Sequence, residues 1–214
     1  MHICHIFCAA EFSGLLQPPK AGDLILAADG GLRHTQALGI SPDIILGDFD
    51  SLGYIPDGGN VLLHPVEKDD TDAMLAARLG LQRGYRRFLF YGAQDGPRLD
   101  HTIANLHTLG FLATHNACGC LVGKTCLAAA FAPGTLRFSA VSTGIISLFC
   151  LGEPVKGLHI EGLKYPLTNG SLTADFPLGV SNHFQDVPAR IHWDAGQLLA
   201  LFDRGNPLPA YQPG

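Results

Sequence analysis

The sequence is poor in charged residues and lacks the features that mark membrane or nucleic-acid-binding chains. Only 15% of its 214 residues are charged and 47% are hydrophobic, which is typical of a folded globular protein. The net charge is −5 and no basic run occurs, so we expect no nucleic-acid partner. No apolar stretch approaches the ~20 residues that cross a bilayer, and the N-terminus lacks the layout of a signal peptide. We therefore expect a cytoplasmic protein without a membrane partner.

Paired cysteines are missing as well. None of the six cysteines forms a C-x-x-C pair, and most lie within apolar runs. They are Cys4, Cys8, Cys118, Cys120, Cys126 and Cys150. This spacing favours reduced cysteines in the core over a disulfide framework or a zinc site.

The first part of the chain alternates strand and helix patterns. Apolar runs predict strands at residues 3–8, 24–28, 44–46, 61–63, 88–91 and 118–122. Amphipathic patterns predict helices at residues 71–82 and 100–115. Such alternation predicts an α/β fold, with a Rossmann-like, largely parallel sheet covered by helices over residues 1–130.

The pattern changes near Pro133, and no convincing amphipathic helix follows. Short strand-like runs at residues 135–138, 145–149, 155–160, 172–174, 189–193 and 198–202 are separated by glycine-containing turns. Regular short strands with turns predict an all-β sandwich domain over residues 131–214. The proline-rich residues 205–214 are expected to fray.

The most informative motif, Gly-Asp-Phe-Asp-Ser at residues 47–51, directly follows a predicted strand. If the extended geometry persists, Asp48 and Asp50 point in the same direction. Two carboxylates that project together repel each other unless a cation lies between them, and a hard divalent ion such as Mg²⁺ takes oxygen ligands and normally keeps open positions for phosphate. Ligands of open α/β sheets bind at the carboxyl ends of the strands, so acids there predict a rim for metal and phosphate.

Two further acidic motifs have both a functional and a structural interpretation. Asp29-Gly30-Gly31 follows a strand and opens a helical stretch, where it could approach an anion or form a tight turn with an aspartate cap. Residues 68–72 place Asp69, Asp70 and Asp72 before a helix. Ordinary helix capping explains one acid, whereas three acids in four positions favour a bound cation.

A third motif, Arg98-Leu99-Asp100-His101, ends a loop before a helix. Arginine can hold two phosphate oxygens in its planar fork. The alternatives are a purely structural ion pair between Arg98 and Asp100, or a helix cap by Asp100.

Taken in order, these motifs resemble thiamine pyrophosphokinase. The matching segments in the first part are residues 28–31, 42–43, 47–51, 69–72 and 98–101, together with Asn105. In the second part they are residues 162–167, 179–182 and 196–199. The chain departs from the family at residues 8–12, where a glycine-rich loop is common, and at His183, where an acid is common.

The resemblance implies a homodimer that transfers the pyrophosphate group of ATP to thiamine with Mg²⁺, giving thiamine diphosphate and AMP. It implies metal binding by Asp48, Asp50 and Asp69, with Asp72, Arg98 and Asp100 as further catalytic residues. It implies thiamine contacts by Ser181 and Asn182. The implied nucleotide-binding residues are Asp29, Gly30, Gly31, Ser51, Thr71, His101 and Asn105.

Two alternatives remain open from the sequence. One is a pyrophosphokinase that acts on a hydroxymethyl-pterin, although Ser181-Asn182 fits the thiamine pattern. The other is a nucleotide- or metal-binding sensor without turnover, although the acids are intact at every expected position.

Overall fold

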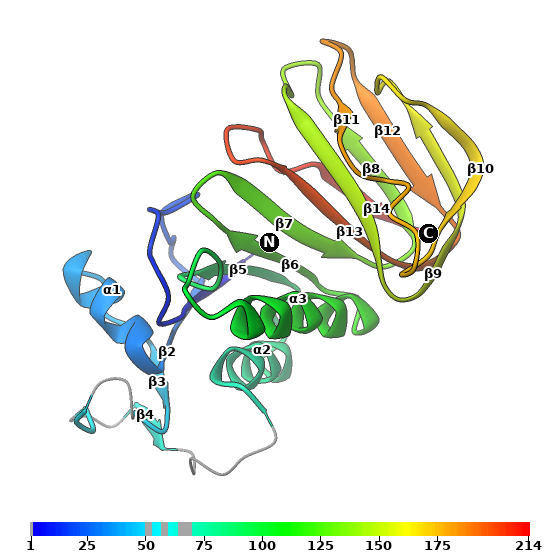
Figure 1. Ribbon diagram of the computed structural model, residues 1–214. Helices are drawn as coiled ribbons and strands as arrows, with labels where there is room; N and C mark the ends of the chain where they lie inside the picture. The colour runs from blue at the N-terminus through cyan, green and yellow to red at the C-terminus, as the bar shows by residue number, and fades with distance from the viewer. Residues whose placement is uncertain (1, 50–52, 57–59, 64–69) are drawn as a thin grey trace. The chain divides into compact units, whose positions relative to one another are not determined.

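The computed structural model describes residues 2–49, 53–56, 60–63 and 70–214 (Figure 1). The fold is mixed α/β, with many strands and few helices. The chain divides into two compact units, each described separately below. The first unit comprises Met1–Thr108 and Ala117–Lys124, and the second comprises Leu109–Asn116 and Thr125–Gly214.

Parallel strands form the centre of the first unit. They are β1 (Cys4–Phe7), β2 (Leu24–Ala28), β3 (Ile44–Gly47), β4 (Val61–Leu63), β5 (Arg87–Tyr91) and β6 (Cys118–Val122). Their order is β4-β3-β2-β1-β5-β6, and each neighbouring pair is parallel. Nearly every residue of β1, β2 and β5 is buried, as expected when both faces of a parallel sheet are covered. The predicted positions of these strands are confirmed to within one residue.

The first unit also carries the turn η1 (Asp29–Gly31) and the helices α1 (Leu32–Ala37), α2 (Asp72–Gln82) and most of α3 (Leu99–Thr114). Helix α2 contacts β1, β2 and β3 through small residues. A Cβ atom on Gly80 would lie 2.5 Å from Cε1 of Phe88 and 2.9 Å from Sγ of Cys4, so glycine lets the helix lie close to the sheet. The predicted bounds of α2 and α3 are confirmed to within one residue. Among the described residues, no helix has the length and apolar character needed to cross a membrane.

Antiparallel strands form the second unit. They are β7 (Cys126–Phe131), β8 (Gly134–Phe138), β9 (Ile145–Glu161), β10 (Leu167–Leu172), β11 (Asn182–His183), β12 (Ala189–Trp193), β13 (Ala195–Asp203) and β14 (Ala210–Pro213). Their order is β14-β8-β12-β9-β13-β7, and β10 and β11 also pair with β9. Trp193, Ile191, Leu198 and Phe202 are almost completely buried and form part of the core.

Several features of the second unit differ from the sequence predictions. Strands β7 and β11 were not predicted, and the run predicted at 172–174 shares only its first residue with β10. The runs predicted at 145–149 and 155–160 are one strand, β9, which continues past Gly152 with a register shift against β13. The prediction that residues 205–214 fray is wrong, because Ala210–Pro213 forms β14 and pairs with β8. Proline is compatible with this position because β14 is an edge strand.

Candidate functional site

A cavity of about 360 Å³ lies at the carboxyl ends of β1, β2 and β5 in the first unit. Its wall consists of the segments that follow these strands and the first turns of α2 and α3. The carboxyl edge of a parallel sheet is where ligands of open α/β folds bind. The predicted site residues that line it are Asp29, Thr71, Asp72, Arg98, His101 and Asn105.

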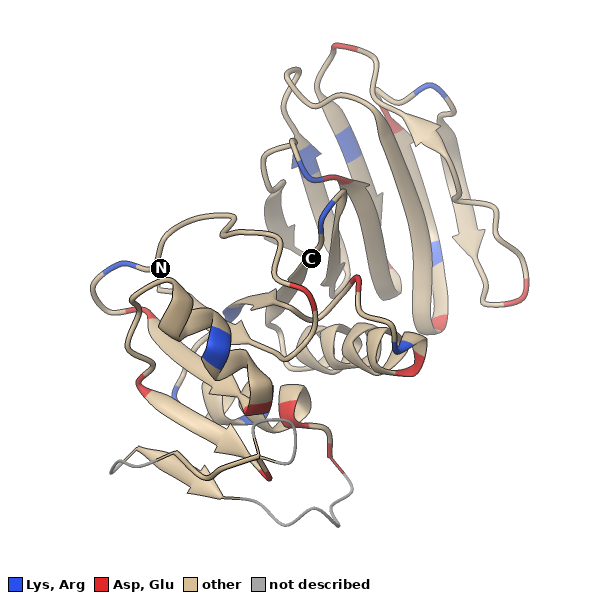
Figure 2. Ribbon diagram, turned by 60° about the vertical axis from the view of Figure 1, so that its left-hand side comes forward, with Lys and Arg blue, Asp and Glu red and all other residues tan. Residues whose placement is uncertain are grey.

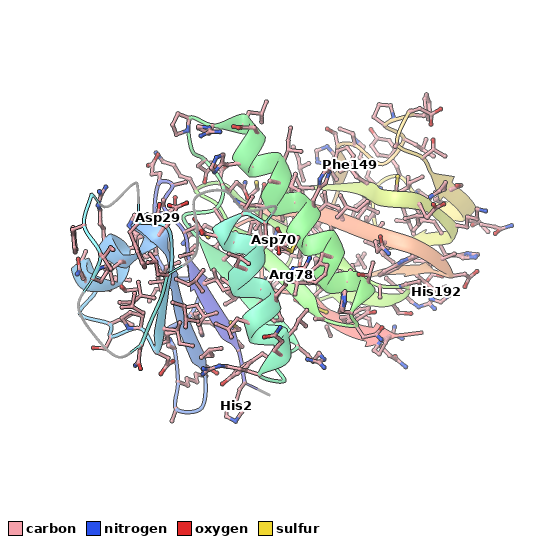
Figure 3. All side chains as sticks on the ribbon, turned by 90° about the horizontal axis from the view of Figure 1, so that it is seen from below. His2, Asp29, Asp70, Arg78, Phe149 and His192 are labelled. Atoms are coloured by element: carbon pink, nitrogen blue, oxygen red, sulfur yellow. The ribbon has the colours of Figure 1, made fainter. Side chains whose placement is uncertain are left out.

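Asp29 has the strongest features of a ligand-binding residue. It is only 6% exposed, and its φ of 47° is uncommon for a residue other than glycine. Its Oδ1 atom is buried and has no hydrogen-bond partner among the described residues. A buried carboxylate oxygen without a donor is costly, and such groups are concentrated at functional sites. Asp29, labelled in Figure 3, therefore has the geometry of a residue that accepts a hydrogen bond from a ligand.

The alternative interpretation of Asp29 as a helix cap is wrong. Neither η1 nor α1 has a side-chain cap hydrogen bond, and the residue that precedes α1 is Gly31. Gly30 and Gly31 are buried but do not line the cavity. A Cβ atom on Gly31 would lie 1.9 Å from the carbonyl oxygen of Phe7. Glycine is required there because the start of α1 lies directly against the end of β1.

Asp48 follows the end of β3 and is half-buried. Its neighbour Gly47 lies next to Asp29, since a Cβ atom on Gly47 would be 3.1 Å from that of Asp29. Phe49 is buried and has a φ of 62°, so the extended geometry assumed for Asp48 and Asp50 ends at Phe49. This premise of the sequence prediction is therefore wrong, because a left-handed residue between the two acids breaks the alternation of an extended strand.

Several predicted site residues lie outside the described residues. These are Asp50, Ser51 and Asp69, which include two of the three predicted Mg²⁺ ligands. Within the described ranges, no group of three or more His, Cys, Asp and Glu side chains is arranged to hold a metal ion. Figure 2 shows acidic residues of the first unit on loops and at the ends of elements.

The start of α2 places Thr71 and Asp72 in the cavity wall. Thr71 caps the helix, because its Oγ1 accepts a hydrogen bond from the amide of Met74 at 3.2 Å. Asp70 instead forms an ion pair with Arg78, with 2.9 Å between Oδ2 and Nε (Figure 3). Asp72 lies in the first turn, where a negative charge is favourable. The helix is thus capped by the hydroxyl of Thr71, and the acids around it are not needed as caps.

Arg98 and Asp100 form an exposed ion pair at the start of α3. The Nε–Oδ1 distance is 3.2 Å and the Nη2–Oδ2 distance is 2.5 Å. The hydrogen bonds from Arg98 lower the pKa of the Asp100 carboxyl to about 2. The ion pair between Arg98 and Asp100 that was considered as an alternative is therefore present. Arg98 nevertheless lines the cavity, whereas Asp100 does not. His101 lines the cavity and is exposed.

Asn105 connects α3 to the loop after β5. It is 7% exposed, and its Nδ2 donates to the carbonyl oxygen of Ala93 at 2.7 Å. Both residues line the cavity. Asn105 therefore fixes the position of the cavity wall through its amide group.

The wall segment that follows β1 consists of Cys8, Ala9 and Ala10. These residues were not among the predicted site residues, although residues 8–12 were identified as the place where the family commonly has a glycine-rich loop. The amides of Cys8 and Ala10 donate to the carbonyl oxygens of Tyr91 and Gly92, both at 2.8 Å. Burial, and to a smaller extent Asp72, raise the pKa of the Cys8 thiol to about 12, so the thiol is neutral. These small residues carry little side-chain chemistry, so the available signals were their position after a buried strand and their match to the place of the family's glycine-rich loop.

The predicted thiamine contacts, Ser181 and Asn182, lie in the second unit. Asn182 is 7% exposed, and its side chain is occupied by the fold. Its Oδ1 accepts from the amides of Tyr165 and His183, both at 2.9 Å, and its Nδ2 donates to the carbonyl of Tyr165 at 2.8 Å. Ser181 is exposed with a φ of 60°, and its amide donates to Oγ of Ser147 at 3.0 Å. Asn182 therefore holds two segments together, while the Ser181 side chain faces solvent.

Large apolar side chains are exposed on the segments around Ser181 and Asn182. Tyr165 is 56% exposed, Phe176 63%, Leu178 51% and Val180 44%. Nζ of Lys164 lies 5.3 Å from the centre of the Tyr165 ring. This part of the second unit thus offers both aromatic and polar groups at its surface.

Comparisons with known proteins give one consistent result. A family model described as the catalytic domain of thiamin pyrophosphokinase matches residues 19–120. A second model, described as the vitamin B1 binding domain of thiamin pyrophosphokinase, matches residues 137–198. The chain is also 29% identical over 185 residues to the thiamine pyrophosphokinase of Bacillus subtilis, covering 83% of this chain and 86% of that protein.

Solved structures with similar folds include two bacterial proteins. The crystal structure of thiamine pyrophosphokinase from Bacillus subtilis has a TM-score of 0.79 at 24% identity, covering 94% of this chain and 98% of that one. A thiamin pyrophosphokinase family protein from Enterococcus faecalis has a TM-score of 0.76 at 25% identity, covering 95% and 99%. The similarity extends over nearly the whole of each chain.

Proposed function

Because the chain belongs to the thiamine pyrophosphokinase family, we propose that it transfers the pyrophosphate group of ATP to the hydroxyl of thiamine, giving thiamine diphosphate and AMP. One observation of the structure carries the proposal for the site. The cavity at the carboxyl edge of the parallel sheet is lined by Asp29, whose buried Oδ1 atom has no partner among the described residues, and it lies within the unit that the catalytic-domain model matches.

In the proposed site, ATP occupies this cavity. Arg98 contacts phosphate oxygens, and the first turns of α2 and α3 present Thr71 and His101 to the nucleotide. Polyphosphate transfer depends on positioning and charge neutralisation more than on covalent chemistry. Asn105 contributes by holding the loop after β5, and Gly31 allows α1 to approach β1 closely enough to place Asp29.

The residues present fit a magnesium ion. Asp48 follows a residue that lies next to Asp29, and carboxylate oxygens are the ligands that Mg²⁺ prefers. We propose that Asp48, Asp50 and Asp69 hold the ion, while Asp72 and Asp100 shape the charge around it. When bound, Mg²⁺ would neutralise charge on the phosphate groups. Oδ1 of Asp29 is suited to accept a hydrogen bond from a metal-bound water or from the nucleotide.

We further propose that the two parts of the chain have separate roles. The parallel strands support a Rossmann-like ATP- and Mg²⁺-binding domain over residues 1–130, and the antiparallel strands support a β-sandwich that binds thiamine over residues 131–214. The exposed apolar residues around Ser181 and Asn182 support a homodimer in which thiamine contacts this surface. A cytoplasmic location is consistent with the six free cysteines.

The alternatives have less support. The match to a vitamin B1 binding domain over residues 137–198 argues against a hydroxymethyl-pterin as the acceptor. Oδ1 of Asp29, which has no partner among the described residues, and Arg98, which lines the same cavity, argue for catalysis rather than for a sensor without turnover.

The test is to incubate the purified protein with ATP, Mg²⁺ and thiamine and to separate the products by chromatography. Attack on the β-phosphorus gives AMP and thiamine diphosphate in equal amounts. ADP as the main nucleotide product would identify an ordinary kinase and contradict the proposal.

A further inference from the structure

His34, on α1, contacts the wall of the cavity without lining the cavity itself. Its Nε2 atom lies 2.8 Å from the carbonyl oxygen of Ala10. A carbonyl oxygen can only accept a hydrogen bond, so Nε2 carries the proton and donates it. His34 thus holds the wall segment formed by Cys8, Ala9 and Ala10, which we call the β1 wall.

The other edge of the β1 wall is held by the end of β5. The amides of Cys8 and Ala10 donate to the carbonyl oxygens of Tyr91 and Gly92 at 2.8 Å. Between these two donors, the amide of Ala9 lies in a bend that follows β1. Among the described residues, that amide makes no backbone hydrogen bond. The β1 wall therefore offers a donor for a phosphate oxygen, provided that its backbone is fixed.

The ring of His34 is fixed by aromatic contacts. It stacks on Phe12 with 5.4 Å between ring centres and an interplanar angle of 25°. Phe12 in turn lies 6.2 Å from the rings of both Phe7 and Tyr91. The donor of His34 therefore has a defined position relative to β1 and β5.

We propose that His34 is a positioning residue, whose hydrogen bond to Ala10 fixes the β1 wall in the conformation that receives ATP. This inference rests on the proposed function, because ATP is the ligand it assumes. The same short helix follows directly on Asp29 and Gly31, and Gly31 presses against Phe7. Helix α1 therefore positions both the carboxylate of Asp29 and the β1 wall, which line the same cavity.

Three substitutions separate the hydrogen bond from the ring. His34→Gln keeps a donor near the position of Nε2 and loses the ring, His34→Phe keeps the ring and loses the donor, and His34→Ala loses both. His107→Ala is the matched control, because His107 is an exposed histidine on α3 of the same unit. For each variant, hydrogen exchange of residues 8–13 is measured without nucleotide, and KM for ATP and kcat are measured at saturating thiamine.

In His34→Phe and His34→Ala, we expect the amides of residues 8–13 to exchange faster and KM for ATP to rise about five-fold with little change in kcat. A change of about five-fold corresponds to the net free energy of one hydrogen bond. His34→Gln should restore most of both properties, and His107→Ala should match the wild type. Normal exchange and KM in His34→Phe would overturn the proposal, as would failure of His34→Gln to restore either. Faster exchange with an unchanged KM would show that His34 stabilises the fold without affecting ATP binding, and would also overturn the proposal.

Hydrogen exchange requires no turnover, so the two proposals can fail separately. If the wild-type protein forms no AMP from ATP and thiamine, the proposed function fails. The exchange rates of the variants would still show whether His34 fixes the β1 wall.

Discussion

The side chains of Asp29 in the first unit and Asn182 in the second are buried to a similar extent but differ in their hydrogen bonds. Asp29 is 6% exposed and Asn182 is 7% exposed, and a left-handed residue occurs at or next to each. Oδ1 of Asp29 has no partner among the described residues, whereas the amide of Asn182 makes three hydrogen bonds within the fold. Since buried polar groups are normally satisfied, the difference separates a group available to a ligand from one that stabilises the fold.

The comparison gives each residue a distinct signature. Removing a group that serves a ligand lowers activity and leaves stability unchanged or higher. Removing a group that serves the fold lowers stability first, and activity falls only as a consequence.

The largest effect is expected for Asp29→Asn, with turnover reduced about 100-fold or more, the scale seen when one preorganised polar contact to the reacting group is removed. Asparagine tolerates the left-handed conformation, and neutralising an unpartnered buried carboxylate removes an unfavourable burial, so the free energy of unfolding should stay equal or rise. Steady-state assays and urea unfolding are measured on the same preparations.

Asp95→Asn is the matched control for this variant. Asp95 has a φ of 61° but is exposed, lies outside the cavity lining, and its Oδ2 accepts from the amide of Lys124. Its turnover should be near normal. Near-normal turnover in Asp29→Asn, or an equal loss of turnover in Asp95→Asn, would show that Asp29 does not have a special role in ligand binding.

Arg98 is an intermediate case, because it lines the cavity and is already paired with Asp100. We expect Arg98→Ala to lower kcat/KM for ATP about 10- to 100-fold, because one or two strong charge-assisted hydrogen bonds to phosphate are lost. Arg98→Lys should not restore it, because lysine lacks the planar fork. The stability of both variants should change little, since the ion pair is exposed. Recovery of most activity by lysine would show that Arg98 contributes only its charge.

Asn182→Ala should lower the free energy of unfolding of the second unit by about 1–3 kcal/mol, because three backbone groups lose their hydrogen bonds to the Asn182 side chain. Urea unfolding monitored by the fluorescence of the buried Trp193 reports on this unit. Ser181→Ala is the control and should be nearly neutral, since that side chain is exposed. If Asn182→Ala abolishes turnover at unchanged stability, Asn182 belongs with Asp29 as a ligand-binding residue.

His5 is a satisfied buried group in the first unit and should give the smallest effect. Its Nε2 lies 3.2 Å from Oδ2 of Asp23, and burial lowers the pKa of His5 more than Asp23 raises it. The unfolded chain therefore binds the proton more readily, so stability falls as the pH decreases below about 6.5. The free energy of unfolding should depend less on pH between 7 and 5 in His5→Gln than in the wild type. An equal dependence would show that His5 does not contribute to it.

The strands of the first unit were predictable because each consists mostly of apolar residues, and β2, β3 and β5 are also bounded by glycine or charge. The second unit was less predictable where pairing partners decide the structure. Leu127–Phe131 in β7 is rich in alanine, which does not favour strands by itself, and it is stabilised by pairing with β13. Residues 210–213 carry a proline and are polar at one position, and only β8 beside them makes them a strand.

The sequence indicated where in the fold the candidate site lies, but not what each of its residues does. Acids after buried strands indicated the edge of the sheet at which the cavity lies, and Asp29 lines that cavity together with Asp72 at the start of α2. The left-handed backbone at Asp29 and Phe49 depends on tertiary contacts and has no local sequence signal. The role of His34 depends on a residue 24 positions away, Ala10, which only the folded chain brings into contact.

The most direct test is a crystal structure with Mg²⁺ and α,β-methylene-ATP, in which the bond broken by pyrophosphate transfer cannot be cleaved. The account predicts that the nucleotide occupies the cavity and that a nucleotide group or metal-bound water lies within about 3.2 Å of Oδ1 of Asp29. A nucleotide bound elsewhere, with that oxygen still without a partner, would contradict it.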